Sequence, residues 1–370
     1  MEIGVLVTGV GPGSTGEQVY KALRFGRRRY RIAVANMDLE RAIVAPGAGR
    51  IALPPASDAS YLDAVADAAN AFGARFVVPG SDVELFRVAA GREALARRTP
   101  AIPLVNDPAV ITVCSDKGET AAAISRAGLR APRTLDCGSL EAVLAGVARA
   151  GLRFPLVLKP RKGGGSADVY VAQDPEELRF HAERILRGST KAIVQEYVGD
   201  AASEFTVGVL HHPDGTLAGS FALRRDLSSL LSVRSRAPNR TGRGELGPQL
   251  VVSSGFSQGD VDDFPEVRAQ AERVAAAVGS RGPLNVQGRL VDGELAVFEV
   301  NPRFSGTEAM RAMAGWNAVE ALVEWHLGLP SSLAGYRARP CAFVRTVVEH
   351  RLDRPAGVRA AALRGVVQSP

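Results

Sequence analysis

The sequence predicts an α/β and α+β protein, in which a doubly wound N-terminal domain is followed by two further α+β units. Residues 1–105 alternate between short apolar strands and amphipathic helices, which is the order of a parallel sheet covered on both faces. A glycine-rich segment at 162–166 joins two apolar strands, and Asp292-Gly293 is a two-residue hairpin signal between two more. The length of 370 residues suits two or three domains.

The N-terminal domain carries a glycine-rich turn after its first strand. We expect strands at 3–8, 30–35, 75–79 and 102–105, and helices at 17–25, 61–72 and 84–98. The run from Gly11 through Gly13 to Gly16, with Asp38 after the second strand, matches the dinucleotide-binding fingerprint. A substrate carboxylate or phosphate would suit the same helix N-terminus. Gly11 and Gly13 are therefore candidate substrate-binding residues, and a nicotinamide-dependent dehydrogenase is an alternative.

Another loop of this domain is placed where ligands bind in doubly wound sheets. The run from Pro79 to Glu84, which contains Asp82, follows the third strand at its carboxyl end. A simple turn and helix cap would give the same sequence pattern.

The middle of the chain combines a linker helix with a small α+β unit. Helical spacing from Ala109 to Ala127 predicts one helix within 106–130, started by Asn106-Asp-Pro. Residues 131–202 are expected to hold strands at 154–160, 167–171 and 192–198 and a capped helix at 174–186. Successive glycines at 163–165 let backbone N–H groups approach phosphate oxygens, although a surface hairpin would have the same composition.

The third unit, 203–330, is expected to form a second sheet. It contains a hairpin at 203–224, a helix at 265–278 and the hairpin around Asp292. The arginine-rich segment 225–246 is expected to be a loop, either a solvated face or a funnel for an anionic substrate. A capping box, Ser305 to Glu308, precedes one helical run at 309–327. We derive no function for the tail at 331–370.

Polar side chains meet at the end of the last hairpin. Glu299 and Asn301 are two residues apart on one strand and share a face, and Gln287 faces them from the partner strand. Three oxygen donors on one face suit a hard cation such as Mg²⁺. Arg303 and the following helix start would add an anion site. An edge hairpin with solvated polar ends is the alternative.

The composition excludes several classes of partner and site. The net charge is only +6 and no basic run is interleaved with aromatic residues, so we expect no nucleic-acid partner. No apolar run approaches the roughly 20 residues of a membrane span, and the chain starts directly in a strand. Three widely spaced cysteines, Cys114, Cys137 and Cys341, suggest reduced thiols and a cytoplasmic protein. Lysine is scarce, and three of five lysines lie at 117, 159 and 162.

Three segments in this order resemble the ATP-grasp superfamily, most closely the carbamoyl-phosphate-synthetase large-subunit type in a short, single-module form. They are FPLVLKPRKGGGS, IVQEYVGD with SEFTVGVL, and NVQGRLVDGELAVFEVNPRFSG. The resemblance covers residues 1–330. It implies a pre-ATP-grasp domain at 1–105, a linker helix at 106–130, a lid at 131–202, a metal-binding C-terminal subdomain at 203–330 and an extension at 331–370.

The resemblance also implies roles for individual residues. Mg²⁺, expected as two ions and replaceable by Mn²⁺, would be held by Gln287, Glu299 and Asn301. Arg303 and Lys159 would be catalytic. ATP would be bound by Lys117, Lys159, Lys162, Gly164, Gly165, Ser166, Gln195, Glu196, Tyr197, Val198 and Glu204. The substrate would be bound by Arg224, Arg303, Ser305, Gly306, Thr307, Gly11 and Gly13.

The activity implied is that of an ATP-dependent carboxylate–amine ligase, which forms an amide or peptide-like bond through an acyl phosphate and releases ADP and phosphate. The partners would be a small-molecule acid and amine, and the chain could form a homodimer. The synthetase has a Ser-Arg-Ser pattern where this chain has Phe304-Ser-Gly-Thr-Glu, and the second module of the synthetase is absent here. This departure argues against carbamoyl phosphate formation. A carbamoylating or carboxylating ligase and a catalytically silent ATP-binding module are alternatives.

Overall fold

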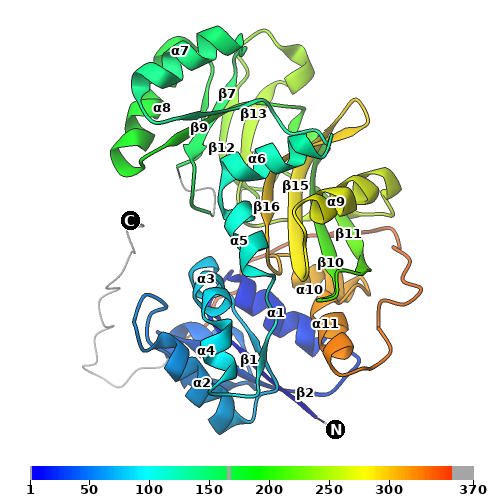
Figure 1. Ribbon diagram of the computed structural model, residues 1–370. Helices are drawn as coiled ribbons and strands as arrows, with labels where there is room; N and C mark the ends of the chain where they lie inside the picture. Colours follow the sequence, from blue (N-terminus) through cyan, green and yellow to red (C-terminus); the bar gives the residue numbers. More distant parts are fainter. Residues whose placement is uncertain (1, 165–167, 352–370) are drawn as a thin grey trace.

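A computed structural model describes residues 2–164 and 168–351, and its sheets form three regions (Figure 1). A five-stranded parallel sheet lies at one end of the molecule and a four-stranded antiparallel sheet at the other. A six-stranded antiparallel sheet lies between them. The predicted combination of a doubly wound domain with two α+β units is therefore confirmed.

The N-terminal sheet has the strand order β3-β2-β1-β4-β5, with β1 at its buried centre. Its strands are β1 (Ile3–Val7), β2 (Tyr30–Asn36), β3 (Gly49–Ala52), β4 (Phe76–Val78) and β5 (Ile102–Pro103). Its helices are α1 (Thr15–Arg24), η1 (Leu39–Val44), α2 (Tyr61–Phe72), α3 (Asp82–Ala90) and α4 (Arg92–Ala96). The sequence did not predict the short edge strand β3, and the expected helix at 84–98 is two helices that meet at Gly91.

The strands β1 and β4 pair in parallel, and Gly80, which follows β4, lets the chain pack closely against the end of β1 and the start of α1. A Cβ on Gly80 would lie 2.2 Å from the carbonyl oxygen of Thr8 and 2.6 Å from the Cα of Gly16. The starts of α1 and α3 therefore lie next to each other at this edge, where ligands bind in doubly wound sheets.

Two short helices connect this domain to the four-stranded sheet. They are α5 (Pro108–Ser115) and α6 (Lys117–Arg126), so the predicted single linker helix is wrong. The break falls at Asp116, whose extended backbone and carboxylate cap α6 by accepting from the N–H groups of Gly118 and Glu119.

The four-stranded sheet has the order β6-β9-β7-β8 and packs against two helices. Its elements are β6 (Thr134–Cys137), α7 (Leu140–Ala150), β7 (Leu156–Pro160), β8 (Tyr170–Ala172), α8 (Pro175–Gly188) and β9 (Ala192–Glu196). The pair β6 and α7 was not predicted.

The six-stranded sheet has the order β16-β15-β10-β11-β14-β17. Its strands are β10 (Glu204–His211), β11 (Leu217–Arg225), β14 (Gly259–Val261), β15 (Pro283–Val291), β16 (Glu294–Asn301) and β17 (Cys341–Phe343). Helix α9 (Pro265–Ala277) covers one face through a shared apolar core. The strand β17 comes from the tail, which the sequence left without a role.

Two sequence expectations for this unit are wrong. The arginine-rich segment is a loop only in part, because β12 (Val233–Pro238) within it pairs with β13 (Gln249–Ser253). The helical run at 309–327 is two helices, α10 (Glu308–Met313) and α11 (Ala318–His326). They are separated at Gly315, whose φ of +88° is a left-handed conformation, and the next residue, Trp316, is buried.

Helix α11 joins the six-stranded sheet to the N-terminal domain. Its residues belong to one apolar core with α1 and β1. The carboxylate of Glu320, which is buried, accepts from the backbone N–H groups of Arg27 and Arg28 at 3.0 and 2.8 Å. Asn317 donates to the carbonyl of Ala22. No helix within 2–164 or 168–351 is long and apolar enough to cross a membrane.

We predict that Glu320→Ala destabilises the protein by about 2 kcal/mol, because it leaves two backbone donors and the Tyr30 hydroxyl without this acceptor. The midpoint of urea unfolding measures the loss. Glu93→Ala, at an exposed position on α4, is the control and should change the midpoint little. An equal effect of both variants would show that Glu320 does not hold this junction.

Candidate functional site

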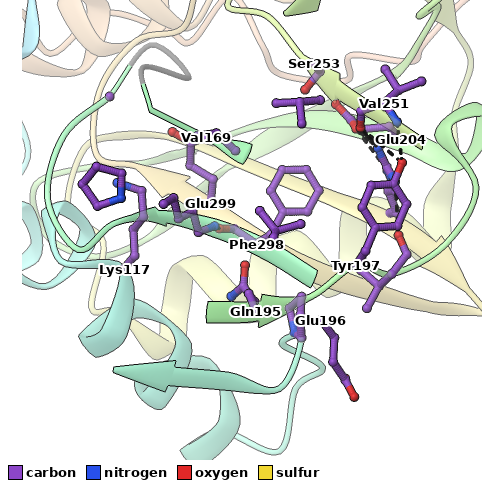
Figure 2. A pocket seen from close by; sticks show the side chains of 18 of the residues that line it. Lys117, Val169, Gln195, Glu196, Tyr197, Glu204, Val251, Ser253, Phe298 and Glu299 are labelled. Atoms are coloured by element: carbon purple, nitrogen blue, oxygen red, sulfur yellow. Dashed lines mark hydrogen bonds and ion pairs between the residues drawn. The ribbon is translucent and has the colours of Figure 1, made fainter. Parts of the chain in front are cut away.

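A pocket lies between the four-stranded and six-stranded sheets, and it has an apolar end and a charged end. Figure 2 shows Tyr197 and Glu204 at one end, Lys117 and Glu299 at the other, and Phe298 between them. The predicted ATP-binding residues that line it are Lys117, Lys159, Lys162, Gly164, Gln195, Glu196, Tyr197, Val198 and Glu204. Gly165 and Ser166 lie outside the described residues.

The apolar end has the shape and chemistry for a flat aromatic base. Tyr197 is buried, and its hydroxyl donates to the carbonyl and accepts from the N–H of Val251, which fixes the ring. The Arg289 guanidinium lies 4.6 Å from the ring centre. Val157 and Phe298 add apolar walls.

Of the predicted ATP-binding residues, Gln195 and Glu196 end β9, and Tyr197 and Val198 follow it. The Glu196 side chain points away from the pocket, towards Arg133 at 3.5 Å. The side chain of Gln195 donates to Thr134. The N–H groups of Glu196 and Tyr197 already donate to the carbonyls of Arg133 and Pro155, so a contact of this backbone with a base stays a prediction.

Glu204 is held by two buried arginines. Its carboxylate oxygens lie 2.9 Å from Arg225 and 3.1 Å from Arg289, and all three side chains are almost fully buried. Burial lowers the pKa of Arg225, and Glu204 opposes that shift. The predicted contact of Glu204 with ATP stays a prediction, and a bound hydroxyl would have to share oxygens that already have partners.

A β-bulge sets the position of the charged end. Gln287 pairs with Glu299 but Gly288 pairs with Val297, so Phe298 is an extra residue in β16. The carbonyl of Phe298 accepts from Lys159 Nζ at 3.2 Å. Gly288 is required at the bulge because its Cβ would lie 2.8 Å from the Ala296 carbonyl oxygen.

Lys117 is the second lysine at this end. It is the first residue of α6, and its Nζ donates to the carbonyl of Gly163 in the glycine-rich loop at 2.6 Å. Gly163 has a φ of +117°, which glycine adopts without strain. Arg161 holds Asp116, the cap of α6, at 2.7 Å, so the loop and the helix start are tied together.

The charged end carries more positive than negative charge. The Glu299 carboxylate interacts electrostatically with Lys117, Lys159, Arg225 and Arg303. Burial, and then repulsion from Lys117, lowers the pKa of Lys159 to about 8. Burial also lowers the pKa of Lys117, and Glu299 opposes that shift. Arg225 and Arg303 are paired with Glu204 and Asp82, so Lys117 and Lys159 give this end its excess of positive charge, which attracts polyanions such as phosphates.

The predicted metal ligands lie on one face of the β15–β16 pair. Gln287 is directly opposite Glu299, and Asn301 follows two residues along the same strand. The set has one carboxylate and two amide oxygens, which fits a hard cation that shares its shell with phosphate and water. No group of three or more His, Cys, Asp or Glu side chains that could hold a metal exists within 2–164 and 168–351. These residues fit Mg²⁺, and their role as ligands stays a prediction.

Arg303 lies beside this face and is oriented by the N-terminal domain. Its Nε lies 2.6 Å from the carboxylate of Asp82, at the start of α3. Its Nη1 donates to the carbonyl of Phe304, and its Nη2 is 3.5 Å from Asn301. Asp82 therefore links the loop that the sequence singled out to the predicted catalytic arginine.

Two groups of predicted substrate residues lie in different places: Arg224 is exposed on β11, and Ser305, Gly306 and Thr307 form the turn after β16. Arg224 does not reach the pocket, because it forms an exposed ion pair with Asp260, while its neighbour Arg225 points inward. The hydroxyls of Ser305 and Thr307 bind each other at 2.6 Å and so hold their own turn. The carbonyl of Gly306 accepts from Arg345, which the sequence did not single out.

Arg345 comes from the chain after β17 and reaches the N-terminal domain. Its Nη2 lies 2.7 Å from the Gly306 carbonyl and 3.3 Å from Gln18, and its guanidinium lies 5.7 Å from the Phe256 ring centre. Among the described residues, Arg345 forms no ion pair with a carboxylate. Burial lowers its pKa, and Glu17 opposes the shift. No sequence pattern could reveal it, since its neighbours come from three distant segments.

The glycine-rich turn after β1 is occupied by the protein itself. The N–H of Gly13 donates to the Glu17 carboxylate at 2.7 Å, and a Cβ on Gly13 would lie 2.7 Å from the Phe256 ring. Asp38 caps η1 instead of facing the turn. A carboxylate at this helix start repels a pyrophosphate, so the geometry gives the dehydrogenase alternative no support. Gly11 donates to Ser14 in the same turn.

The chain is similar in sequence to a protein family and to a curated protein. Residues 253–347 match a family described as ATP-grasp in the biosynthetic pathway with Ter operon. The carbamoyl phosphate synthase large chain of Vibrio cholerae is 23% identical over 216 residues, 58% of this chain. The match spans only 18% of that relative's length.

Two solved structures share most of the fold. An L-amino acid ligase from Bacillus licheniformis is 17% identical with a TM-score of 0.60, and the match covers 89% of this chain and 75% of that one. The biotin carboxylase domain of Hydrogenobacter thermophilus 2-oxoglutarate carboxylase, in complex with MgADP, is 17% identical with a TM-score of 0.59, covering 91% and 70%. The chain has the ATP-grasp fold of these ligases, which confirms the predicted resemblance.

We predict that MgADP binding takes up protons near pH 8. Lys159, with a pKa of about 8, is half neutral there, and an adjacent phosphate raises its pKa. Calorimetry in buffers of different ionisation enthalpy should give an uptake of up to about half a proton at pH 8 and almost none at pH 6. Affinity should fall as pH rises through 8, because the free lysine then loses its proton.

Lys159→Met should abolish this uptake. Lys162→Ala, at an exposed position in the loop that follows β7, should keep it. Uptake that persists in Lys159→Met would show that another group takes the proton.

Proposed function

We propose that this chain, which has the ATP-grasp fold, is an ATP- and Mg²⁺-dependent carboxylate–amine ligase. In the reaction, a carboxylate oxygen attacks the γ-phosphate of ATP, giving an acyl phosphate and ADP. An amine then attacks the acyl carbon, the C–O bond to phosphate breaks, and an amide and phosphate are released. The single observation that carries the proposal is the pair of lysines, Lys117 and Lys159, beside Glu299 at the end of a pocket shaped for a base.

The apolar end and the charged end of the pocket would bind different parts of ATP. The adenine would lie against Tyr197 and Phe298, with the phosphates towards Lys117 and Lys159. Gln287, Glu299 and Asn301 would hold the Mg²⁺, which would neutralise phosphate charge. Lys117 also fixes the loop carbonyl of Gly163, so this loop would close over the phosphates and exclude water.

Arg303 would stabilise the transferring phosphoryl group. Its guanidinium is partly buried and already oriented by Asp82, so little reorganisation is needed when charge develops. Loss of one such donor typically costs about 3 kcal/mol of transition-state stabilisation, on the order of 100-fold in rate.

The acid would lie on the side of the turn at 305–307. Among the described residues, Arg345 forms no ion pair there, and its guanidinium lies next to the Gly306 carbonyl. It also contacts Gln18 and the Phe256 ring, and Glu17 acts on it electrostatically. A cation in this setting suits a carboxylate of the substrate. The similarity to an L-amino acid ligase supports an amino acid as one substrate class.

Phosphate release tests the function. We predict that the wild-type chain is stabilised by MgATP and MgADP but not by NAD⁺ or NADP⁺, by about 2.7 kcal/mol at 100 times the dissociation constant. Thermal shifts measure this, followed by a phosphate-release screen of amino acids in pairs and of bicarbonate with amines. Glu299→Ala should abolish release while the chain stays folded. Stabilisation by NAD⁺ alone, or full turnover in Glu299→Ala, would contradict the proposal.

For an acid identified in that screen, Arg345→Gln should raise the KM of the acid by about tenfold or more, since a charge-assisted contact is lost. The KM for ATP should stay unchanged. Arg339→Gln, in the same segment but exposed, is the matched control. An unchanged KM for the acid in Arg345→Gln would place the acid elsewhere.

A further inference from the structure

A second cavity opens from the charged end of the nucleotide pocket. Its volume is about 620 Å³, and it shares Lys117, Gly163 and Glu299 with the first pocket. From there it extends between α3, α5 and β16, beyond the residues that line the nucleotide pocket. A molecule in this cavity would reach the place where the phosphates are expected.

The part of the cavity beyond the nucleotide pocket has one charged residue among the described ones. That residue is Asp82, and the remaining wall is mainly apolar, with Leu85, Phe86, Cys114, Val300 and Pro302. Asp82 Oδ1 pairs with Arg303, while no described residue donates a hydrogen bond to Oδ2. Glu84, the other acid of this loop, is buried against Tyr61 and Ser81 and does not line the cavity.

We propose that this cavity binds the amine substrate, with Asp82 as the group that accepts its N–H. This inference rests on the proposed ligase function and names the place and class of its nucleophile. Asp82 is paired with Arg303 through Oδ1 and is the one charged residue among the described ones in this part of the cavity, so Oδ2 would accept from an ammonium group and not from an acid. The apolar wall, with Phe86 at 42% exposure, suits an amine with an apolar side chain.

The cavity does not offer a covalent alternative. Cys114 is the nucleophilic side chain in its apolar wall, and burial raises the pKa of this thiol to about 12. A thiol with that pKa is protonated at neutral pH and is not activated for attack. Binding and proton acceptance are therefore the functions that the cavity residues can perform.

Asp82 would act in both steps of the reaction, as the partner of Arg303 and as the acceptor for the amine. Its Oδ1 accepts from Arg303, and no residue within 2–164 or 168–351 donates a hydrogen bond to its Oδ2, which would accept from the amine. An ammonium substrate must lose two protons when the amide forms. One would pass to the Asp82 carboxylate and then to water, and the other leaves with the departing phosphate as HPO₄²⁻. The C–N bond forms as the C–O bond to phosphate breaks, so charge and atoms balance.

Binding of amines without turnover tests the proposal. The full chain, saturated with MgADP, is titrated calorimetrically with glycinamide, leucinamide and phenylalaninamide, and with 4-methylpentanoate as an acid of similar shape. We predict that the apolar amides bind, and that Asp82→Asn weakens their binding about tenfold or more. Asp82→Asn should not weaken binding of the acid. Asp63→Asn, which removes an exposed carboxylate on α2, is the control and should change nothing.

A second variant keeps the carboxylate and changes the wall. Phe86→Ala should weaken binding of leucinamide and phenylalaninamide but not of glycinamide, because only the larger probes contact the ring. Wild-type chain that binds no amide, or Asp82→Asn that binds them all as tightly, would overturn the amine site. Failure of MgADP to bind would instead overturn the proposed function, so the two failures are distinguishable.

Discussion

The charge balance around Glu299 is the constraint on which the rest of the site depends. Lys117 and Lys159 interact with its carboxylate, while Arg225 and Arg303 are paired with Glu204 and Asp82. Burial lowers the pKa of both lysines, so the protein holds positive charge here at a cost. A bound polyanion would relieve that cost, so the site is built to be completed by phosphate groups and a metal ion.

The backbone holds these charges in place through irregular structure. The bulge at Phe298 turns its carbonyl towards Lys159, and the break at Asp116 places Lys117 at a helix start. Both features interrupt a regular element at the residue that the site needs. Regular pairing through residue 298 would carry the following residues of β16 to the opposite face, because side chains alternate along a strand.

The site also depends on contacts between distant parts of the chain. Asp82 from the N-terminal sheet orients Arg303, and Arg345 from the tail reaches the turn after β16. The docking of α11 through Glu320 holds the N-terminal domain against the six-stranded sheet. The acid and amine sites that we propose are therefore completed by different parts of the chain, the tail and the N-terminal domain.

The sequence by itself determined the fold class and the local groups. Hydrophobic alternation, the turn at Asp292-Gly293 and the pairing of Gln287 with Glu299 follow from short-range rules, and the structure confirms them. Tertiary structure alone decided that Arg225 rather than Arg224 points inward, that the arginine-rich segment pairs as a hairpin, and that Asp82 and Arg345 reach the site. These outcomes depend on packing between residues up to hundreds of positions apart, whose energies no local pattern contains.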